Sequence, residues 1–259
     1  MNTSIPLRAG LYALLACLGA RSHAQSLDWG DWSSPGIGTY ENGESILIRA
    51  VDNASVVPAS GEITSAHAVS GALPFGTAPG AGEYGFFHNA AATSTSWSVE
   101  IDLSGFSIGA DTVIGFSNLD GRDFADLSPS YAVLDFYDSS GNKVALSPAS
   151  FLGSYDVTWQ GYTWDANSSF DPLTGVWSVA ADSGAAHPAG SYFAAVSDAF
   201  FLSNLPSDVS RIVYTNYGGT AYAYDSTLFY AGQAVPEPSA PLLGLAACAG
   251  FALRRRRSR

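Results

Sequence analysis

Apolar and polar residues alternate with a period of two over several short stretches of this chain. The clearest stretch is Ser96–Asp102, where every second residue is apolar (Trp97, Val99 and Ile101). Such alternation predicts a β-strand with one buried and one solvated face. Less regular runs predict further strands at Glu44–Asp52, Gly82–His88, Asp111–Ser117, Tyr131–Tyr137, Lys143–Ser147, Val157–Thr163, Val176–Ala180, Tyr192–Val196, Arg211–Tyr217 and Ser226–Ala231.

The segments between these runs carry turn signals rather than a helical period. Asp138–Asn142 predicts a β-hairpin with Gly141 at a positive φ. Leu202–Ser210 has room for a single helical turn, with Ser207 and Asp208 as its cap. Many short strands separated by turns predict an all-β fold, an antiparallel β-sandwich or a jelly roll. Trp29 and Trp32 are expected to cover an edge of its core.

The first 24 residues have the layout of a secretory signal peptide. An apolar run, expected to be helical, follows Arg8, and Ser22-His23-Ala24 offers a small-x-small cleavage site. A buried N-terminal helix is one alternative, and a lipoprotein signal ending at Cys17 is another. We therefore divide the chain into a signal peptide (1–24), a β-sandwich body (25–234) and a C-terminal segment (235–259), with Ala231–Ala234 as a short linker.

Composition narrows the chemistry of the body. Both cysteines, Cys17 and Cys248, lie outside it, so the body has no disulfide and no thiol nucleophile. The body contains four basic residues and twenty-two Asp and Glu residues, so its net charge is −18. A body of this charge repels phosphate backbones, so nucleic acid is not expected as a partner.

The acidic segment Asn118–Asp126 is the best candidate for a metal site. Ca²⁺ is bound by six to eight oxygens, and Asp120, Asp123 and Asp126 could supply several from one loop. In the alternative interpretation, the segment is a turn in which Arg122 pairs with an aspartate. Asp138 and Asn142 are weaker candidates, because hairpin geometry already explains both.

Aromatic residues are dense between positions 155 and 177, namely at Tyr155, Trp159, Tyr162, Trp164, Phe170 and Trp177. Exposed Trp and Tyr rings can stack on sugar rings, so Trp159 and Trp164 are candidates for glycan stacking. The alternative is that these rings fill the core. On one regular strand the two tryptophans would lie on opposite faces, because five residues separate them.

Catalysis finds little support in the sequence, and we predict a body that is not an enzyme. No nucleophile motif is present, and the body histidines, His67, His88 and His187, have no metal-binding spacing. Glu100 is expected on the solvated face of its strand. Because carboxylates are plentiful, a secreted carbohydrate-active enzyme with paired carboxylates, a glycoside hydrolase or lyase, remains the alternative.

The C-terminal segment has three parts in order. Pro236, Glu237 and Pro238 are followed by the apolar run Ala240–Leu253 and then by Arg254, Arg255, Arg256 and Arg257. This segment resembles a PEP-CTERM sorting signal, the C-terminal tag of bacterial exosortase substrates. The resemblance covers about a tenth of the chain.

The resemblance implies a route and partners. The protein would be exported, held transiently in the inner membrane by a short helix, and processed by a membrane exosortase. Pro236–Pro238 would serve in recognition, and the arginines would stop and orient the helix. The body would then reach the cell surface or the extracellular polysaccharide matrix. Since an apolar run of fourteen residues is shorter than the ~17–25 that span a bilayer, we expect a marginal anchor.

Overall fold

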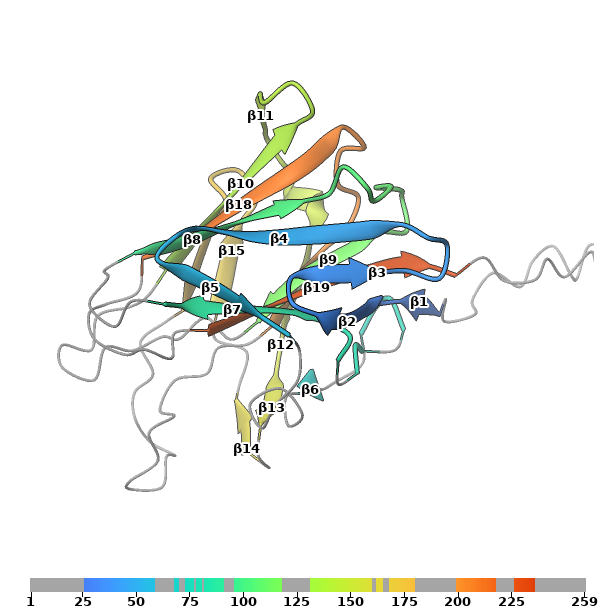
Figure 1. The fold of residues 1–259 in the computed structure, drawn as a ribbon, viewed down its shortest axis with the longest axis horizontal. Coiled ribbons are helices and arrows are strands. Elements are labelled where there is room, and N and C mark those ends of the chain that lie inside the picture. Colours follow the sequence, from blue (N-terminus) through green and yellow to red (C-terminus); the bar gives the residue numbers. More distant parts are fainter. Residues whose placement is uncertain are drawn as a thin grey trace, which may run out of the picture.

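The computed structural model describes residues 26–58, 68–69, 73–76, 78–80, 82–90, 96–117, 131–159, 162–164, 168–179, 199–217 and 226–235. These residues form antiparallel strands and one 3₁₀ turn, Pro148–Ser150 (Figure 1). The predicted all-β antiparallel class is therefore confirmed. The predicted signal and tail helices lie outside the described residues. Within the described ranges, no helix is long and apolar enough to cross a membrane.

Most strands belong to two sheets. Sheet A has the order β12 (Phe151–Tyr155), β17 (Ala199–Leu202), β9 (Val113–Ser117), β19 (Ser226–Ala234), β7 (Gly85–Asn89), β5 (Ala54–Val57), and β1 (Leu27–Asp28) also pairs with β19. Sheet B has the order β15 (Ser168–Asp171), β16 (Val176–Val179), β10 (Tyr131–Asp138), β18 (Val209–Asn216), β8 (Trp97–Asp102), β4 (Ser45–Asp52), β3 (Ile37–Thr39), β2 (Asp31–Ser34), and β11 (Lys143–Val144) also pairs with β10. A small sheet contains β14 (Tyr162–Trp164), β13 (Val157–Trp159) and β6 (Ala68–Val69).

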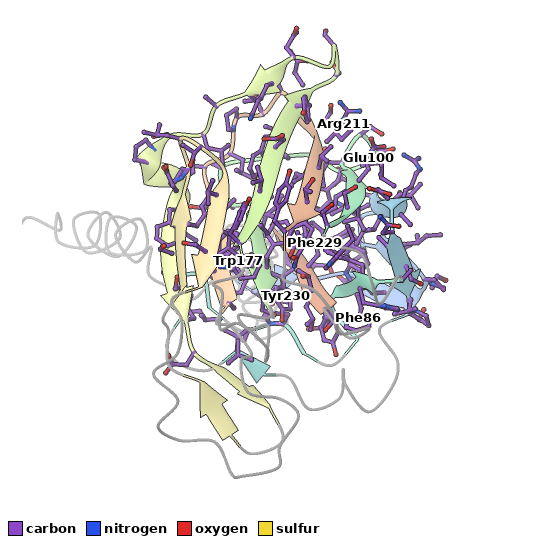
Figure 2. The ribbon with its side chains drawn as sticks, turned by 90° about the vertical axis from the view of Figure 1, so that its left-hand side faces the viewer. Phe86, Glu100, Trp177, Arg211, Phe229 and Tyr230 are labelled. Atoms are coloured by element: carbon purple, nitrogen blue, oxygen red, sulfur yellow. The ribbon has the colours of Figure 1, made fainter. Side chains whose placement is uncertain are left out.

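The two large sheets face each other across a core rich in aromatic rings. Phe116 of sheet A stacks on Tyr214 of sheet B, with ring centroids 5.8 Å apart. Trp177 meets Phe200 edge-on, with ring centroids 4.8 Å apart. Figure 2 shows Trp177 and Phe229 inside the molecule. Burying each such side chain stabilises the fold by about 1.5–3 kcal/mol. A sandwich of this kind can therefore hold together without disulfides.

The two sheets differ in how much of their surface is covered. A second buried cluster, which includes Trp29, Phe86, Phe201 and Tyr230, packs on the other face of sheet A. Strands buried on both faces have no alternation, and every residue of β9 is buried. Sheet B instead alternates along β10, where buried residues separate partly exposed ones. Sheet B therefore has one open face.

Several strand predictions are confirmed. Trp97, Val99 and Ile101 are buried as expected, although Ser98 is buried as well. Asp138–Asn142 closes a hairpin with Gly141 at φ 83°. Trp29 and Trp32 lie in the core, 3% and 1% exposed, in a segment that also contains β1, β2 and β3.

Other predictions are wrong. Val157–Thr163 is not one strand, because β13 turns back and pairs with β14. The segment between β17 and β18 contains a turn at residues 207–208 and no helical turn. Ala231–Ala234 is not a linker, since β19 continues through it and Ala231 is fully buried. The predicted strand Tyr192–Val196 lies outside the described residues.

Candidate functional site

The open face of sheet B is the candidate functional site, and we call it the outer face. It is built by β10, β18, β8 and β4, which lie side by side. Their register lines up the outward side chains in rows across the strands. One row contains Asp135, Val213, Glu100 and Arg49; the next contains Tyr137, Arg211, Asp102 and Leu47.

An ion-pair network occupies the middle of the outer face. Glu100 lies 3.3 Å from Arg49 and 3.2 Å from Arg211, and Arg49 also lies 3.1 Å from Asp102. Figure 2 shows Arg211 and Glu100 beside each other on the outside of the sheet. Hydrogen bonds from Ser104, together with the Arg49 guanidinium, lower the pKa of the Asp102 carboxyl.

Two further contacts extend the network along β10. The Arg211 guanidinium lies over the Tyr137 ring, 4.6 Å from its centroid. Lys143 Nζ lies 2.6 Å from Asp135 Oδ1, and this contact raises the pKa of the lysine. Three of the four basic residues of the body thus lie on one face, each beside a carboxylate. The face is locally close to neutral on a body whose net charge is −18.

A stacked tyrosine pair lies at one end of the outer face. The rings of Tyr131 and Tyr217 are 5.0 Å apart and inclined by 16°. The Tyr217 amide donates to the Tyr131 carbonyl at 2.9 Å, which fixes the two backbones together. Each tyrosine remains 42% exposed. One face of each ring is turned to the other, and the remaining surface of this pre-ordered pair is open to a ligand.

The predicted site residues are distributed differently. Asp120, Asp123 and Asp126 lie between β9 and β10, outside the described residues, and their role in calcium binding stays a prediction. The sorting residues Pro236–Pro238 and Arg254–Arg257 also lie outside them. Within the described part of the chain, no three His, Cys, Asp or Glu side chains are arranged to hold a metal ion.

The hairpin explanation of Asp138 is confirmed. Its Oδ1 accepts hydrogen bonds from the amides of Ser140 and Asn142 at 2.9 and 2.8 Å, and its Oδ2 accepts from the Asn142 side chain at 2.9 Å. These hydrogen bonds lower the pKa of Asp138, and the bond from the Asn142 side chain has the largest effect. Both residues therefore have a structural role.

The aromatic residues between 155 and 177 do not form one group. Phe170 and Trp177 are core residues, 5% and 0% exposed. Trp159 and Trp164 lie on the paired strands β13 and β14, where Trp159 is opposite Tyr162 and Val157 is opposite Trp164. The expectation that they face opposite ways assumed one regular strand, so it no longer applies. Their role in glycan stacking stays a prediction.

Sequence reasoning missed Tyr131 and Tyr217, although one signal was present. In β10 the buried positions are Ala132, Leu134 and Phe136, so the tyrosines at 131 and 137 occupy the solvated phase of the strand. An aromatic residue in that phase is a candidate contact residue. Its stacking on Tyr217, 86 positions later, depends on the pairing of β10 with β18.

Comparison with known proteins adds little. No protein-family model matches the chain, and no curated protein matches it. Among solved structures, that of an exo-beta-agarase aligns with a TM-score of 0.27 and 13% identity, covering 83% of this chain and 25% of the agarase chain. The chain thus spans about a quarter of that protein's length.

Proposed function

We propose that this is an exported bacterial protein of the cell surface or extracellular matrix whose body binds polysaccharide without cleaving it. The proposed export and sorting route is supported by the predicted signal peptide and by the resemblance of residues 235–259 to a PEP-CTERM tail. The binding role is carried by one observation, the exposed Tyr131–Tyr217 stack on the open face of sheet B. Flat tyrosine rings offer the apolar contact that sugar rings use.

The charges on the outer face favour a neutral polysaccharide. Its cations are already paired with Glu100, Asp102 and Asp135, and the rest of the body is strongly acidic. An anionic chain would have to compete with these carboxylates and approach against the field of the body. A neutral chain meets neither cost, so its binding is expected to depend weakly on salt.

The same carboxylates support binding rather than hydrolysis. A glycosidase needs one carboxyl group whose pKa is raised, so that it can donate a proton. On the outer face, the pKa of Asp102 is instead lowered, and the Glu100 carboxylate lies beside the guanidinium groups of Arg49 and Arg211. The carbohydrate-active enzyme remains an outcome of the test.

The test measures retention of the exported protein on neutral polysaccharides (xylan, laminarin, dextran) and on the anionic polysaccharide alginate. If each ring covers about 50 Å² of apolar ligand surface, its loss costs ~1.3 kcal/mol, or about tenfold in affinity. Tyr131→Ala and Tyr217→Ala should each show that loss. Tyr131→Phe keeps the ring and should bind normally.

Leu173→Ala is the matched control, because Leu173 is 66% exposed in the turn between β15 and β16, outside the tyrosine pair. Melting temperatures verify that each variant is folded. No retention on any polysaccharide would refute the binding role. Preference for alginate would refute neutrality of the ligand, and release of reducing ends would establish the enzyme alternative.

A further inference from the structure

The two ends of the described body are paired with each other. In β1, Leu27 is opposite Ala234 of β19 and Asp28 is opposite Gln233. The Val235 amide donates to the Ser26 carbonyl at 3.0 Å. We call these six residues, Ser26–Asp28 and Gln233–Val235, the terminal clasp. Figure 1 shows β1 beside the end of β19, where the chain leaves the sandwich.

The side chain of Gln233 anchors one half of the clasp. Its amide group donates to the Glu44 carboxylate and, at 3.3 Å, to the Ser107 carbonyl. Its oxygen accepts from Asn42 Nδ2 at 2.8 Å. Partial burial raises the pKa of Glu44, but hydrogen bonds from Ser107, Gln233 and Asn42 outweigh it, so the pKa is lowered and the carboxylate stays charged.

Asp28 and close packing anchor the other half. The Asp28 carboxylate accepts from the amides of Gly30 and Glu41 at 2.9 and 2.8 Å. A Cβ at Gly232 would approach the Trp29 ring to 2.9 Å and Leu27 to 3.0 Å, so β1 lies directly against β19 there. A strand of two residues has few backbone bonds of its own, and these contacts are what hold it in place.

We propose that the terminal clasp fixes the exit of the C-terminal segment, so that both ends of the body leave it at one rigid point. Strand β19 ends at Ala234, Val235 still donates to the Ser26 carbonyl, and the next residue is Pro236. A membrane that holds the C-terminal segment would therefore hold the body by the end of β19. This last step rests on the proposed function, whereas the clasp itself does not.

The clasp and the tyrosine pair lie at opposite ends of the sandwich. Tyr40 Oη donates to the Ala231 carbonyl at 2.9 Å, next to the clasp. At the other end of β19, Thr227 Oγ1 lies 2.9 Å from Tyr214 Oη, close to where β18 ends and Tyr217 follows. Nine residues of β19 span about 30 Å. The tyrosine pair is thus presented at the end of the sandwich opposite the attachment point.

One experiment traps the clasp in the full chain in detergent micelles, with Cys17→Ala and Cys248→Ala. Opposed residues of an antiparallel pair have Cα atoms ~4.5–5.5 Å apart, a distance that a disulfide spans. Leu27→Cys with Ala234→Cys should therefore cross-link completely under mild oxidation, detected as a linked peptide by mass. Leu27→Cys with Ser140→Cys is the mismatched control and should stay reduced.

A second measurement needs no cysteine and covers the case in which the variant misfolds. In the unmodified chain, hydrogen exchange at the Val235 amide should be slow, and Gln233→Ala should speed it by about tenfold or more, as expected for loss of a hydrogen bond to a charged group. Phe229, in the middle of β19, is the internal control and should not change.

Free exchange at Val235 in the unmodified chain, or cross-linking no better than the mismatched control, would overturn the clasp. Neither readout involves polysaccharide or sorting. A clasped protein that binds no polysaccharide would refute the proposed function alone.

Discussion

The buried hydroxyl pair of Tyr230 and Ser117 gives the sharpest quantitative prediction. The two oxygens are 2.7 Å apart, and the residues are 3% and 0% exposed. Tyr230→Phe leaves the serine hydroxyl without this partner, and Ser117→Ala does the same to the tyrosine hydroxyl. A buried polar group left unpaired costs about 1–3 kcal/mol, so each single variant should lose that much stability.

The double variant should lose much less than the sum, because neither orphaned hydroxyl remains. The expected coupling free energy is about 1–2 kcal/mol. Urea unfolding of the four proteins, followed by circular dichroism, measures the cycle. Losses that add to within about 0.5 kcal/mol would refute the reasoning, since independent sites behave in that way.

The same tyrosine predicts an alkaline limit to stability. Burial raises the pKa of Tyr230, and it also raises that of Tyr40. The stability contributed by the neutral folded form is present below the unfolded pKa of about 10 and is lost as pH rises toward the folded pKa, by about 1.4 kcal/mol per pH unit per tyrosine. Unfolding free energies between pH 9 and 11 should therefore fall less steeply in Tyr230→Phe. An identical slope would contradict this.

Three further predictions follow from other parts of the molecule. Glu100→Gln should lower the unfolding free energy by about 0.5–1 kcal/mol at low salt. The loss should be smaller at high salt, because the ion pairs of Glu100 are partly exposed. A loss that does not depend on salt would argue against an ionic cause. Gly175→Ala should lower the unfolding free energy by at least ~2 kcal/mol, because φ is 74° and the added Cβ meets the Leu134 carbonyl. Gly141→Ala, at φ 83° in open space, is the control and should lower it by about 1 kcal/mol. Equal melting temperatures of the two variants would show that the contact with Leu134 relaxes. If Asn118–Asp126 binds calcium, a chelator should lower the melting temperature, and an unchanged value would dismiss that site.

The local sequence pattern alone predicted the strands that have one solvent-exposed face. Every second residue is buried at Ile46 and Ile48, at Val99 and Ile101, and at Ala132, Leu134 and Phe136, because one side of these strands faces the core and the other is partly exposed. The hairpin at Asp138–Asn142 could also be predicted from the sequence, because its glycine at positive φ and the aspartate that caps the turn lie within five residues of each other. Such features depend on neighbours in the chain.

Tertiary structure decided whatever depends on distant partners. Val113–Ser117 and Ala199–Leu202 show no alternation because sheet A is covered on both faces. Ala231–Ala234 looks like a linker from its small residues, yet β9 and β1 pair with it and make it strand.

The candidate site follows the same rule. The residue types of the outer face were visible in the sequence, including its scarce cations, but the pairing of β4, β8, β18 and β10 brought them together. Sequence by itself determined an acidic protein of antiparallel β class, and it predicts export. Only the fold decided which tyrosines meet at the surface and that the two ends of the body meet, because strand pairing joins residues that are far apart in the chain, such as Leu27 and Ala234.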